Sequence, residues 1–309
     1  RGLVHRLDHA IPATFSRAVA CLHDQGLEGH GRAVAGGDRL RAAAREGHGD
    51  EHGKGQRAQA GHGLSSLEGA AGLEAQLAEK QAALSETDDE EEKATIEMAL
   101  KSSKKFQEIG ATHFVSCPVQ TWDWANPEEL SNDEVTQFFK MLAEVDQICK
   151  DHGLVQVIHP HLQTVVETKR DIDRVVDNSD VMWCLDTGHM TIGGQDTVEF
   201  AKKYASRVGH VHLKDVNMKS VPPVLARQQS IMEGVQKGLF TPLGQGDVPI
   251  LQTILALESA GYQGWYVIEQ DVAITGEMPG LGEGPITGMK ASVDYLHNIV
   301  APELSKIGK

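Results

Sequence analysis

Several residue types that would point to particular functions are scarce in this chain. Of its 309 residues only 5% are aromatic and only four are cysteine, and no two cysteines form a Cys-x-x-Cys pair. The cysteines are Cys21, Cys117, Cys149 and Cys184. Scattered thiols on apolar stretches behave as small hydrophobic groups, which is typical of a reducing compartment. We therefore expect a cytoplasmic protein.

Positive charge and long apolar runs are also in short supply. The formal net charge is -15, which argues against a nucleic-acid partner because such binding depends on lysine and arginine neutralising phosphates. No apolar run approaches the roughly 20 residues that cross a bilayer, and the N-terminus lacks the apolar core of a signal peptide. With 40% hydrophobic residues, the composition favours one large soluble domain and predicts no membrane partner.

Two common catalytic motifs are missing. No Gly-x-Gly-x-x-Gly opens a helix after a strand, and the pair Gly193 and Gly194 lacks that context, so a nucleotide cofactor is not indicated. No Gly-x-Ser-x-Gly elbow occurs, and the cysteines lack a matched base. Nucleophilic catalysis is therefore unsupported.

Composition divides the chain near residue 80. Residues 1–80 are rich in Gly, Ala, Arg and His and contain no bounded apolar run that predicts a buried strand. Their histidines are irregularly spaced, which favours a poorly specified or disordered segment over a metal-binding tract. A third interpretation is that this stretch is not the natural N-terminus, as after a reading-frame error. Residues 81–309 form the second, better patterned region.

From residue 81 onward, short apolar runs alternate with amphipathic segments. We predict five strands at 113–117, 154–158, 181–185, 208–213 and 264–271. Helical spacing fills the intervals, and Ser131 with Glu134 forms a capping box at the start of one helix. Strict alternation predicts an α/β fold, a (β/α)8 TIM barrel. About three of the eight strands would have to precede His113, so we expect a barrel that is incomplete or irregular over the first 80 residues.

Two loops carry features of a binding pocket. Trp122 and Trp124 follow the first predicted strand and either wall a polyol pocket or pack on the barrel rim. A long excursion follows Asp215 and contains a predicted helix that ends at Gly238. The excursion is long enough to be a lid or a pocket wall.

Ionisable residues follow most of the predicted strands at their carboxyl ends. In a barrel these ends meet at one mouth, where ligands bind. A single such residue is commonly a cap, but a series on successive strands indicates a metal site built from nitrogen and oxygen ligands. The residues are His159, His161, Glu167, Asp186, His189, His212 and Glu269.

These residues lie in five motifs that resemble the inosose dehydratase branch of the xylose isomerase-like barrel superfamily. The motifs begin at His159 (His-Pro-His-Leu-Gln-Thr-Val-Val-Glu-Thr), Leu185 (Leu-Asp-Thr-Gly-His-Met), His210 (His-Val-His-Leu-Lys-Asp-Val), Phe240 (Phe-Thr-Pro-Leu-Gly-Gln-Gly-Asp-Val) and Gly264 (Gly-Trp-Tyr-Val-Ile-Glu-Gln-Asp). They occur in the order of that family, and the likeness covers roughly residues 100–300.

The resemblance implies a set of metal ligands. Asp186, His212 and Glu269 match ligand positions, and the fourth ligand is either His159 or Glu167, because relatives commonly have a Glu where this chain has His159. The ion is expected to be Mn²⁺ or Co²⁺, with Zn²⁺ or Mg²⁺ as alternatives. Gln163 stands where a glycine is expected, a departure that could alter the loop.

The resemblance also implies a reaction. A 2-keto inositol would lose water through an enediolate, with a divalent cation acting as Lewis acid. His161, His189 and Lys214 are the candidates for proton transfer, with the division between base and acid left open. A salt bridge to Asp215 is the alternative role for Lys214. Asp215, with Trp122 and Trp124, is a candidate for binding the small polyol or keto-sugar substrate.

Three other functions remain alternatives. The first is a ketose or sugar-phosphate epimerase or isomerase on the same barrel, which shares the enediolate. The second is metal-dependent DNA repair of the endonuclease IV kind, which the net charge of -15 opposes. The third is a non-catalytic barrel fragment. A homo-oligomer is compatible with each of them.

Overall fold

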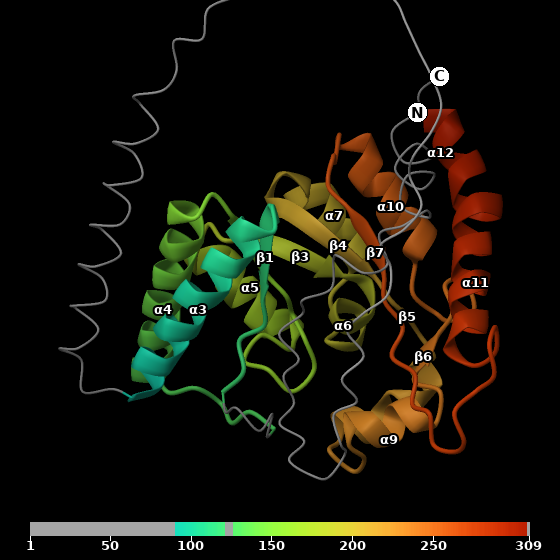
Figure 1. Ribbon diagram of the computed structural model, residues 1–309, viewed down its shortest axis with the longest axis horizontal. Coiled ribbons are helices and arrows are strands. Elements are labelled where there is room, and N and C mark those ends of the chain that lie inside the picture. Colours follow the sequence, from blue (N-terminus) through green and yellow to red (C-terminus); the bar gives the residue numbers. More distant parts are fainter. Residues whose placement is uncertain (1–89, 121–125, 308–309) are drawn as a thin grey trace, which may run out of the picture. The chain divides into compact units, whose positions relative to one another are not determined.

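The computed structural model describes residues 90–120 and 126–307 (Figure 1). The predicted N-terminal segment, residues 1–80, lies outside these ranges. In chain order the strands are β1 (His113–Ser116), β2 (Val155–Ile158), β3 (Met182–Asp186), β4 (Val208–Leu213), β5 (Asp215–Val216), β6 (Phe240–Thr241) and β7 (Tyr266–Ile268). The α-helices are α3 (Glu90–Glu108), α4 (Asn132–Asp151), α5 (Lys169–Asn178), α6 (Thr187–Ile192), α7 (Thr197–Tyr204), α8 (Pro222–Leu225), α9 (Ile231–Gln236), α10 (Ile250–Ser259), α11 (Pro285–Tyr295) and α12 (Ala301–Ile307). Three short elements complete the set: η1 (Ala205–Arg207), η2 (Met218–Ser220) and the π-helical η3 (Leu296–Val300).

Five of the strands form one parallel sheet in the order β1-β2-β3-β4-β7. The order follows the chain, so each crossover carries the next strand in the same direction, as in a barrel arc and unlike a doubly wound sheet with a reversal point. These are the five strands predicted from the sequence. The short β5 and β6 pair with each other as a separate antiparallel ribbon.

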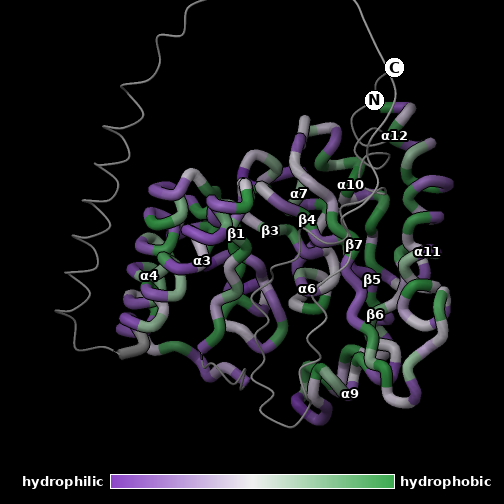
Figure 2. The backbone as a smooth tube through the Cα atoms, viewed as in Figure 1, coloured by the Kyte–Doolittle hydropathy of each residue, from purple (hydrophilic) through white to green (hydrophobic). Residues whose placement is uncertain are grey.

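Amphipathic helices cover the sheet. Helix α4 begins at the predicted capping box, in which the Ser131 side chain accepts from the Glu134 backbone and Glu134 bonds back to Ser131. Its buried residues include Leu142, Val145 and Ile148, spaced for one helical face. Figure 2 shows hydrophilic and hydrophobic residues both present along α4, as that spacing requires.

A single cluster of buried side chains fills the space between sheet and helices. Trp183 on β3 and Phe200 on α7 meet edge to face with their ring centroids 5.4 Å apart, and both are almost fully buried. Burying an aromatic side chain contributes about 2–3 kcal/mol. Contacts of this kind fix the strands, so that the residues at their ends are held rigidly. Among the described residues no helix is long and apolar enough to cross a bilayer.

Candidate metal centre

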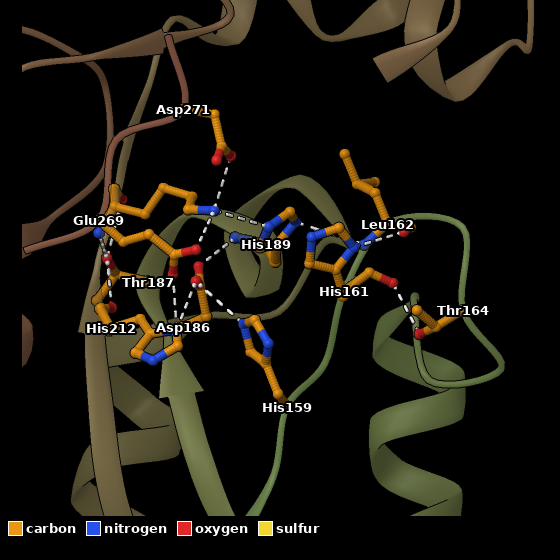
Figure 3. A network of polar contacts seen from close by, with 11 residues as sticks. His159, His161, Leu162, Thr164, Asp186, Thr187, His189, His212, Glu269 and Asp271 are labelled. Atoms are coloured by element: carbon orange, nitrogen blue, oxygen red, sulfur yellow. Dashed lines mark hydrogen bonds and ion pairs between the residues drawn. The ribbon is translucent and has the colours of Figure 1, made fainter. Parts of the chain in front are cut away.

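Four side chains from successive strands of the sheet converge at its carboxyl edge (Figure 3). His159 follows β2, Asp186 ends β3, His212 lies near the end of β4, and Glu269 follows β7. One ligand atom from each residue lies within 4.8 Å of the others. Parallel pairing produces this arrangement, because Asp186 and His212 are register partners and the Glu269 N–H donates to the Leu213 carbonyl at 3.0 Å.

The four groups contact one another directly. His159 Nε2 lies 3.2 Å from Asp186 Oδ2. His212 Nδ1 lies 2.7 Å from Glu269 Oε2 and 3.7 Å from Asp186 Oδ2. The Asp186 side chain is fully buried, both histidine side chains are about 5% exposed, and the Glu269 side chain is 27% exposed. The cluster is thus nearly dry, with Glu269 as its most exposed member.

Two atoms in the cluster test whether a cation fits. His212 Nδ1 and Glu269 Oε2 are buried, and neither has a hydrogen-bond partner despite their short separation. A buried polar atom without a partner costs free energy, so two such atoms aimed at a common point indicate a missing group. Two imidazoles and two carboxylates are suitable ligands for a divalent cation of intermediate hardness. The described residues fit such an ion.

The carboxylates are held in the ionised form that ligation needs. Burial raises the pKa of Asp186, but the Lys214 charge and the hydrogen bonds from His159 and His212 outweigh it, so that the net pKa is lowered well below the ordinary value. Burial opposes ionisation of Glu269 in the same way, and the Lys214 charge together with His212 lowers its pKa in the balance.

The two histidines of the cluster differ in charge. Burial lowers the pKa of His159 and keeps its imidazole neutral, the form that binds a metal. Burial also works against charge on His212, but contacts with Cys184, Asp186 and Glu269 raise its pKa well above the ordinary value. A proton on His212 therefore supplies the positive charge between the two carboxylates that a cation would otherwise supply.

Asp186 belongs to both the cluster and the next helix. Its Oδ1 accepts from the His189 backbone N–H at 2.7 Å and so caps α6, while its Oδ2 faces the cluster. The cap fixes the side-chain rotamer and turns His189 toward the site. The sequence Asp-Thr-Gly-His is therefore one structural unit.

Lys214 lies beside the cluster with its side chain completely buried. Its Nζ donates to Asp271 Oδ2 at 3.0 Å, lies 3.3 Å from Glu269 Oε1 and lies 3.1 Å from His189 Nε2. Burial alone would lower the pKa of Lys214, but the surrounding carboxylates raise it, so the ammonium stays charged. Gly188 makes room for it, since a Cβ there would lie 2.7 Å from Lys214 Cγ.

His161 and His189 stack beside Lys214 with ring centroids 3.7 Å apart. His161 Nδ1 lies 2.7 Å from the Leu162 carbonyl, which can only accept, so this nitrogen carries the proton. Burial lowers the pKa of His161 to about 3 and holds the pKa of His189 well below the usual range. Both rings are therefore neutral and lie next to a fixed positive charge.

This geometry and the sequence pattern can be compared with known proteins. The profile of the xylose isomerase-like TIM barrel family matches residues 49–298. The chain belongs to this family.

Its barrel relatives include an inosose dehydratase of Clostridium perfringens, 37% identical over 150 residues, which cover 47% of this chain and 50% of that one. An inosose dehydratase of Geobacillus kaustophilus is 30% identical over 227 residues, covering 68% and 71% of the two chains. A crystal structure of the IOLI protein with a binding zinc atom matches with a TM-score of 0.51 at 15% identity, over 70% and 72% of the chains, which is a likeness of fold. The chain spans about half the length of the first curated relatives it matches.

Among the predicted barrel-mouth residues, Glu167 does not join the cluster. It is buried on the loop before α5, where its Oε2 accepts from Arg227 at 2.5 Å. Of the two candidates for the fourth ligand, the structure brings His159 to the other three and pairs Glu167 with Arg227. Trp122 and Trp124 lie outside the described residues.

Asp215 has a structural role in place of the predicted contact with substrate. It is 1% exposed, and its two oxygens accept four backbone N–H groups, from Gly244, Gly246, Val216 and Val248, at 2.8–3.1 Å. It therefore has no oxygen left to offer a ligand. Nor does the alternative salt bridge to Lys214 form, because successive side chains on a strand point to opposite faces.

Three residues near the site were not among the predicted site residues. Asp271 is the last residue of the strand predicted at 264–271, and its spacing of two from Glu269 could have placed it on the same side. Cys184 could have been found in the same way, two residues before Asp186 on β3. Arg227 carries no sequence signal, because its partner lies 60 positions away on another loop.

Proposed function

We propose that this chain binds a divalent cation through His159, Asp186, His212 and Glu269 and dehydrates a 2-keto inositol. The observation that carries the proposal is the convergence of four ligand atoms within 4.8 Å at the barrel mouth, beside a charged lysine and two neutral histidines. The named inosose dehydratases among the relatives, at 29–37% identity, support the substrate class.

The cation contributes one kind of chemistry. Bound at this donor set it would act as a Lewis acid toward the ketone oxygen and so acidify the adjacent C–H. Mixed imidazole and carboxylate ligands suit Mn²⁺, Co²⁺, Zn²⁺ or Mg²⁺, and the family resemblance favours Mn²⁺ or Co²⁺ among them. The remaining chemistry falls to the side chains that lie around the cluster.

His161 is the residue we assign as the base. Its Nδ1 is protonated toward the Leu162 carbonyl, which leaves the lone pair on Nε2, and its ring is neutral. A neutral imidazole with a fixed tautomer can take the proton from the substrate carbon without first losing one of its own. The departing hydroxyl leaves as water when it receives that same proton, so the protons balance.

Lys214 acts by charge. Because carboxylates raise its pKa, the ammonium is a weak acid and is better suited to stabilising the negative oxygen of the enediolate. An ammonium can only donate, so His189 Nε2 accepts from it at 3.1 Å. This bond competes with the longer contact, 3.4 Å, from the Leu162 N–H to His189 Nδ1, since a neutral imidazole has one accepting nitrogen. The charged donor takes precedence, and His189 thereby orients Lys214.

The test is to incubate the metal-loaded chain with a 2-keto inositol and follow the products. We expect a dione, seen by its ultraviolet absorbance and by NMR, with loss of one water. Epimer formed without dehydration would instead identify a ketose epimerase, and cleavage of abasic DNA would identify the repair function. Either result would overturn the proposed reaction.

A histidine variant separates chemistry from folding. His161→Asn should lower kcat by about 10²–10⁴-fold, the usual contribution of a general base, while Mn²⁺ affinity stays unchanged. His152→Asn is the matched control, since His152 is also buried and also bonds a backbone carbonyl through Nδ1, that of Ile148 at 2.9 Å. Equal rates in the two variants would exclude His161 as the base.

A further inference from the structure

Cys184 lies directly below Asp186 on the inner face of strand β3. Residues two apart on a strand share a face, so both side chains point into the barrel, with Cys184 about 6.6 Å nearer the start of the strand. The register places Cys184 beside His210 and Asp186 beside His212. Cys184 is completely buried. It therefore belongs to the layer of the barrel interior beneath the four-residue cluster.

Cys184 completes a second set of ligand atoms. Its Sγ and one ring nitrogen each from His159 and His212 lie within 4.8 Å of one another. His212 Nδ1 is buried and forms no hydrogen bond, although Glu269 Oε2 lies 2.7 Å away, so a cation could take the place of that contact. The cysteine is thus part of a three-residue group that contains an unsatisfied donor atom.

The two ligand sets differ in chemical softness. The upper set contains two carboxylates and two imidazoles, whereas the deeper set replaces both carboxylates with one sulfur. Thiolate is a soft ligand and favours metal ions that bind sulfur strongly, which are called thiophilic. Two nitrogens and one sulfur would fill three of the four coordination positions that Zn²⁺ or Cd²⁺ prefers. We propose that His159, Cys184 and His212 form a second, deeper cation position, which takes thiophilic divalent ions.

Both positions use His159 and His212, so one chain cannot fill them together. A thiophilic ion entering the deeper position forms a bond to sulfur and releases the thiol proton to solvent, with no change of oxidation state. It also withdraws two of the four ligands of the upper site. A thiophilic ion should therefore displace a harder ion one for one. This inference concerns metal selection and does not depend on the proposed dehydration.

The experiment is a titration of the metal-free chain with Cd²⁺, read by the thiolate-to-cadmium charge-transfer band in the ultraviolet. We expect the band to appear in the unaltered chain and to be lost in Cys184→Ser, with Cd²⁺ affinity lowered at least about tenfold, a loss that even outer-shell changes produce. Cys149→Ser is the matched control, because Cys149 is equally buried and its thiol lies 3.8 Å from the Ser103 hydroxyl, away from the three-residue group, so the band should persist.

Two further measurements use the unaltered chain and therefore do not depend on whether Cys184→Ser folds. The ¹¹³Cd chemical shift of the unaltered chain should indicate one sulfur ligand. Cadmium added to the Mn²⁺-loaded chain should release one Mn²⁺ per Cd²⁺, seen as the return of the free Mn²⁺ signal in electron paramagnetic resonance. A shift typical of nitrogen and oxygen ligands alone, a band that survives in Cys184→Ser, or Cd²⁺ bound without Mn²⁺ release would each overturn the proposal.

Discussion

Lys214 and Asp215 are neighbours in sequence and have unrelated roles. Lys214 points into the barrel mouth and pairs with Asp271 and Glu269. Asp215 points the other way and accepts hydrogen bonds from backbone N–H groups of the Gly244–Val248 turn. The turn lies so close that a Cβ on Gly246 would be 2.3 Å from Asp215 Oδ1. One of the two charges therefore serves the site, and the other holds the loop that follows β6.

Asp215→Asn should destabilise the fold by about 2–3 kcal/mol. The asparagine side chain keeps one oxygen that can accept hydrogen bonds, but its NH₂ group faces backbone N–H groups that also donate. At least one of these buried N–H groups therefore loses its acceptor. Denaturant unfolding measures the change.

Asp247→Asn is the control for that substitution. Asp247 accepts a single exposed bond, from the Met218 N–H at 2.9 Å, and its loss should cost much less. Equal losses in the two variants would contradict the structural role of Asp215.

Gly188→Ala should disturb Lys214 without touching a ligand of the metal cluster. The new Cβ would meet Lys214 Cγ, close to the backbone, so the lysine has to shift as a whole. Overpacking of this kind costs about 1–3 kcal/mol, and we expect the dehydration rate to fall with it. Thermal melting and a rate assay measure the two effects.

The matched substitution is Gly276→Ala, because a Cβ there meets nothing within 4 Å. It should leave both rate and stability unchanged. An unaltered rate in Gly188→Ala would show that the position of Lys214 does not matter.

The convergence of the four-residue cluster could be predicted because each residue lies at, or next to, the end of a predicted strand. Parallel pairing then brings His159, Asp186, His212 and Glu269 together whatever the loops do. The pairing of Glu167 could not be predicted, because it depends on how a distant loop folds back. The hydrogen bonds of Asp215 could not be predicted either, because every residue type except proline has a backbone N–H group and the sequence does not show which ones lie near Asp215.

At the scale of elements, the predicted excursion after Asp215 forms α8 and α9. An ion pair between Arg227 and Glu167 connects it to the loop before α5. Arg227, just after α8, has a φ of 57°, which is unusual for a residue other than glycine. It reaches the buried Glu167, whose other oxygen, Oε1, has no partner. Gln163, on the loop before Glu167, also has a positive φ of 64° at the position where a glycine was expected. Backbone strain of this kind costs about 1–3 kcal/mol and persists where the surroundings hold it.

Arg227→Ala should destabilise the chain by about 1–3 kcal/mol. Removing one partner of a fully buried pair costs about 3–5 kcal/mol, and the effect is smaller here because the Arg227 side chain is about a third exposed. The Glu167 carboxylate is left buried and unpaired. Unfolding in denaturant measures the loss.

A double-mutant cycle separates the ion pair from other effects of removing Arg227. Glu167→Gln combined with Arg227→Ala removes the stranded charge and should recover part of the loss. Strictly additive losses would show that the pair contributes nothing and that the Arg227 side chain acts through other contacts.

Strands were predicted more accurately than helix ends. Helix α10 begins only at Ile250, because Asp215 binds the Gly246 and Val248 N–H groups in the turn that precedes it. Helix α11 begins at Pro285, where proline suits the first turn. Helix ends depend on such tertiary contacts, whereas a buried strand is marked by its own apolar residues.

At the scale of the whole molecule, the cluster places ionised carboxylates in a buried site of a chain that already carries a net charge of -15. The protonated His212 and Lys214 balance the two carboxylates of the cluster. A divalent cation would take over the role of the His212 proton and connect β2, β3, β4 and β7 at their carboxyl ends, far from one another in sequence. The unfolded chain has no such arrangement, so a cation would bind the native state selectively.

Adding Mn²⁺ or Co²⁺ should therefore raise the melting temperature, and a chelator should reverse the effect. At a free ion concentration 100 times the Kd the stabilisation is about 2.7 kcal/mol, which corresponds to a rise of about 5–10 °C for a domain of this size. Differential scanning calorimetry measures the shift.

The ligand variant His159→Asn decides whether the shift comes from the cluster. It removes one nitrogen donor without changing the net charge of the carboxylates or the Asp186 cap on α6. Its melting temperature should respond little to the ion, whereas Glu167→Gln, which changes a buried carboxylate outside the cluster, should retain the full response. A response lost in Glu167→Gln and kept in His159→Asn would assign the fourth ligand to Glu167 and require the loop before α5 to rearrange on binding, breaking the pair with Arg227.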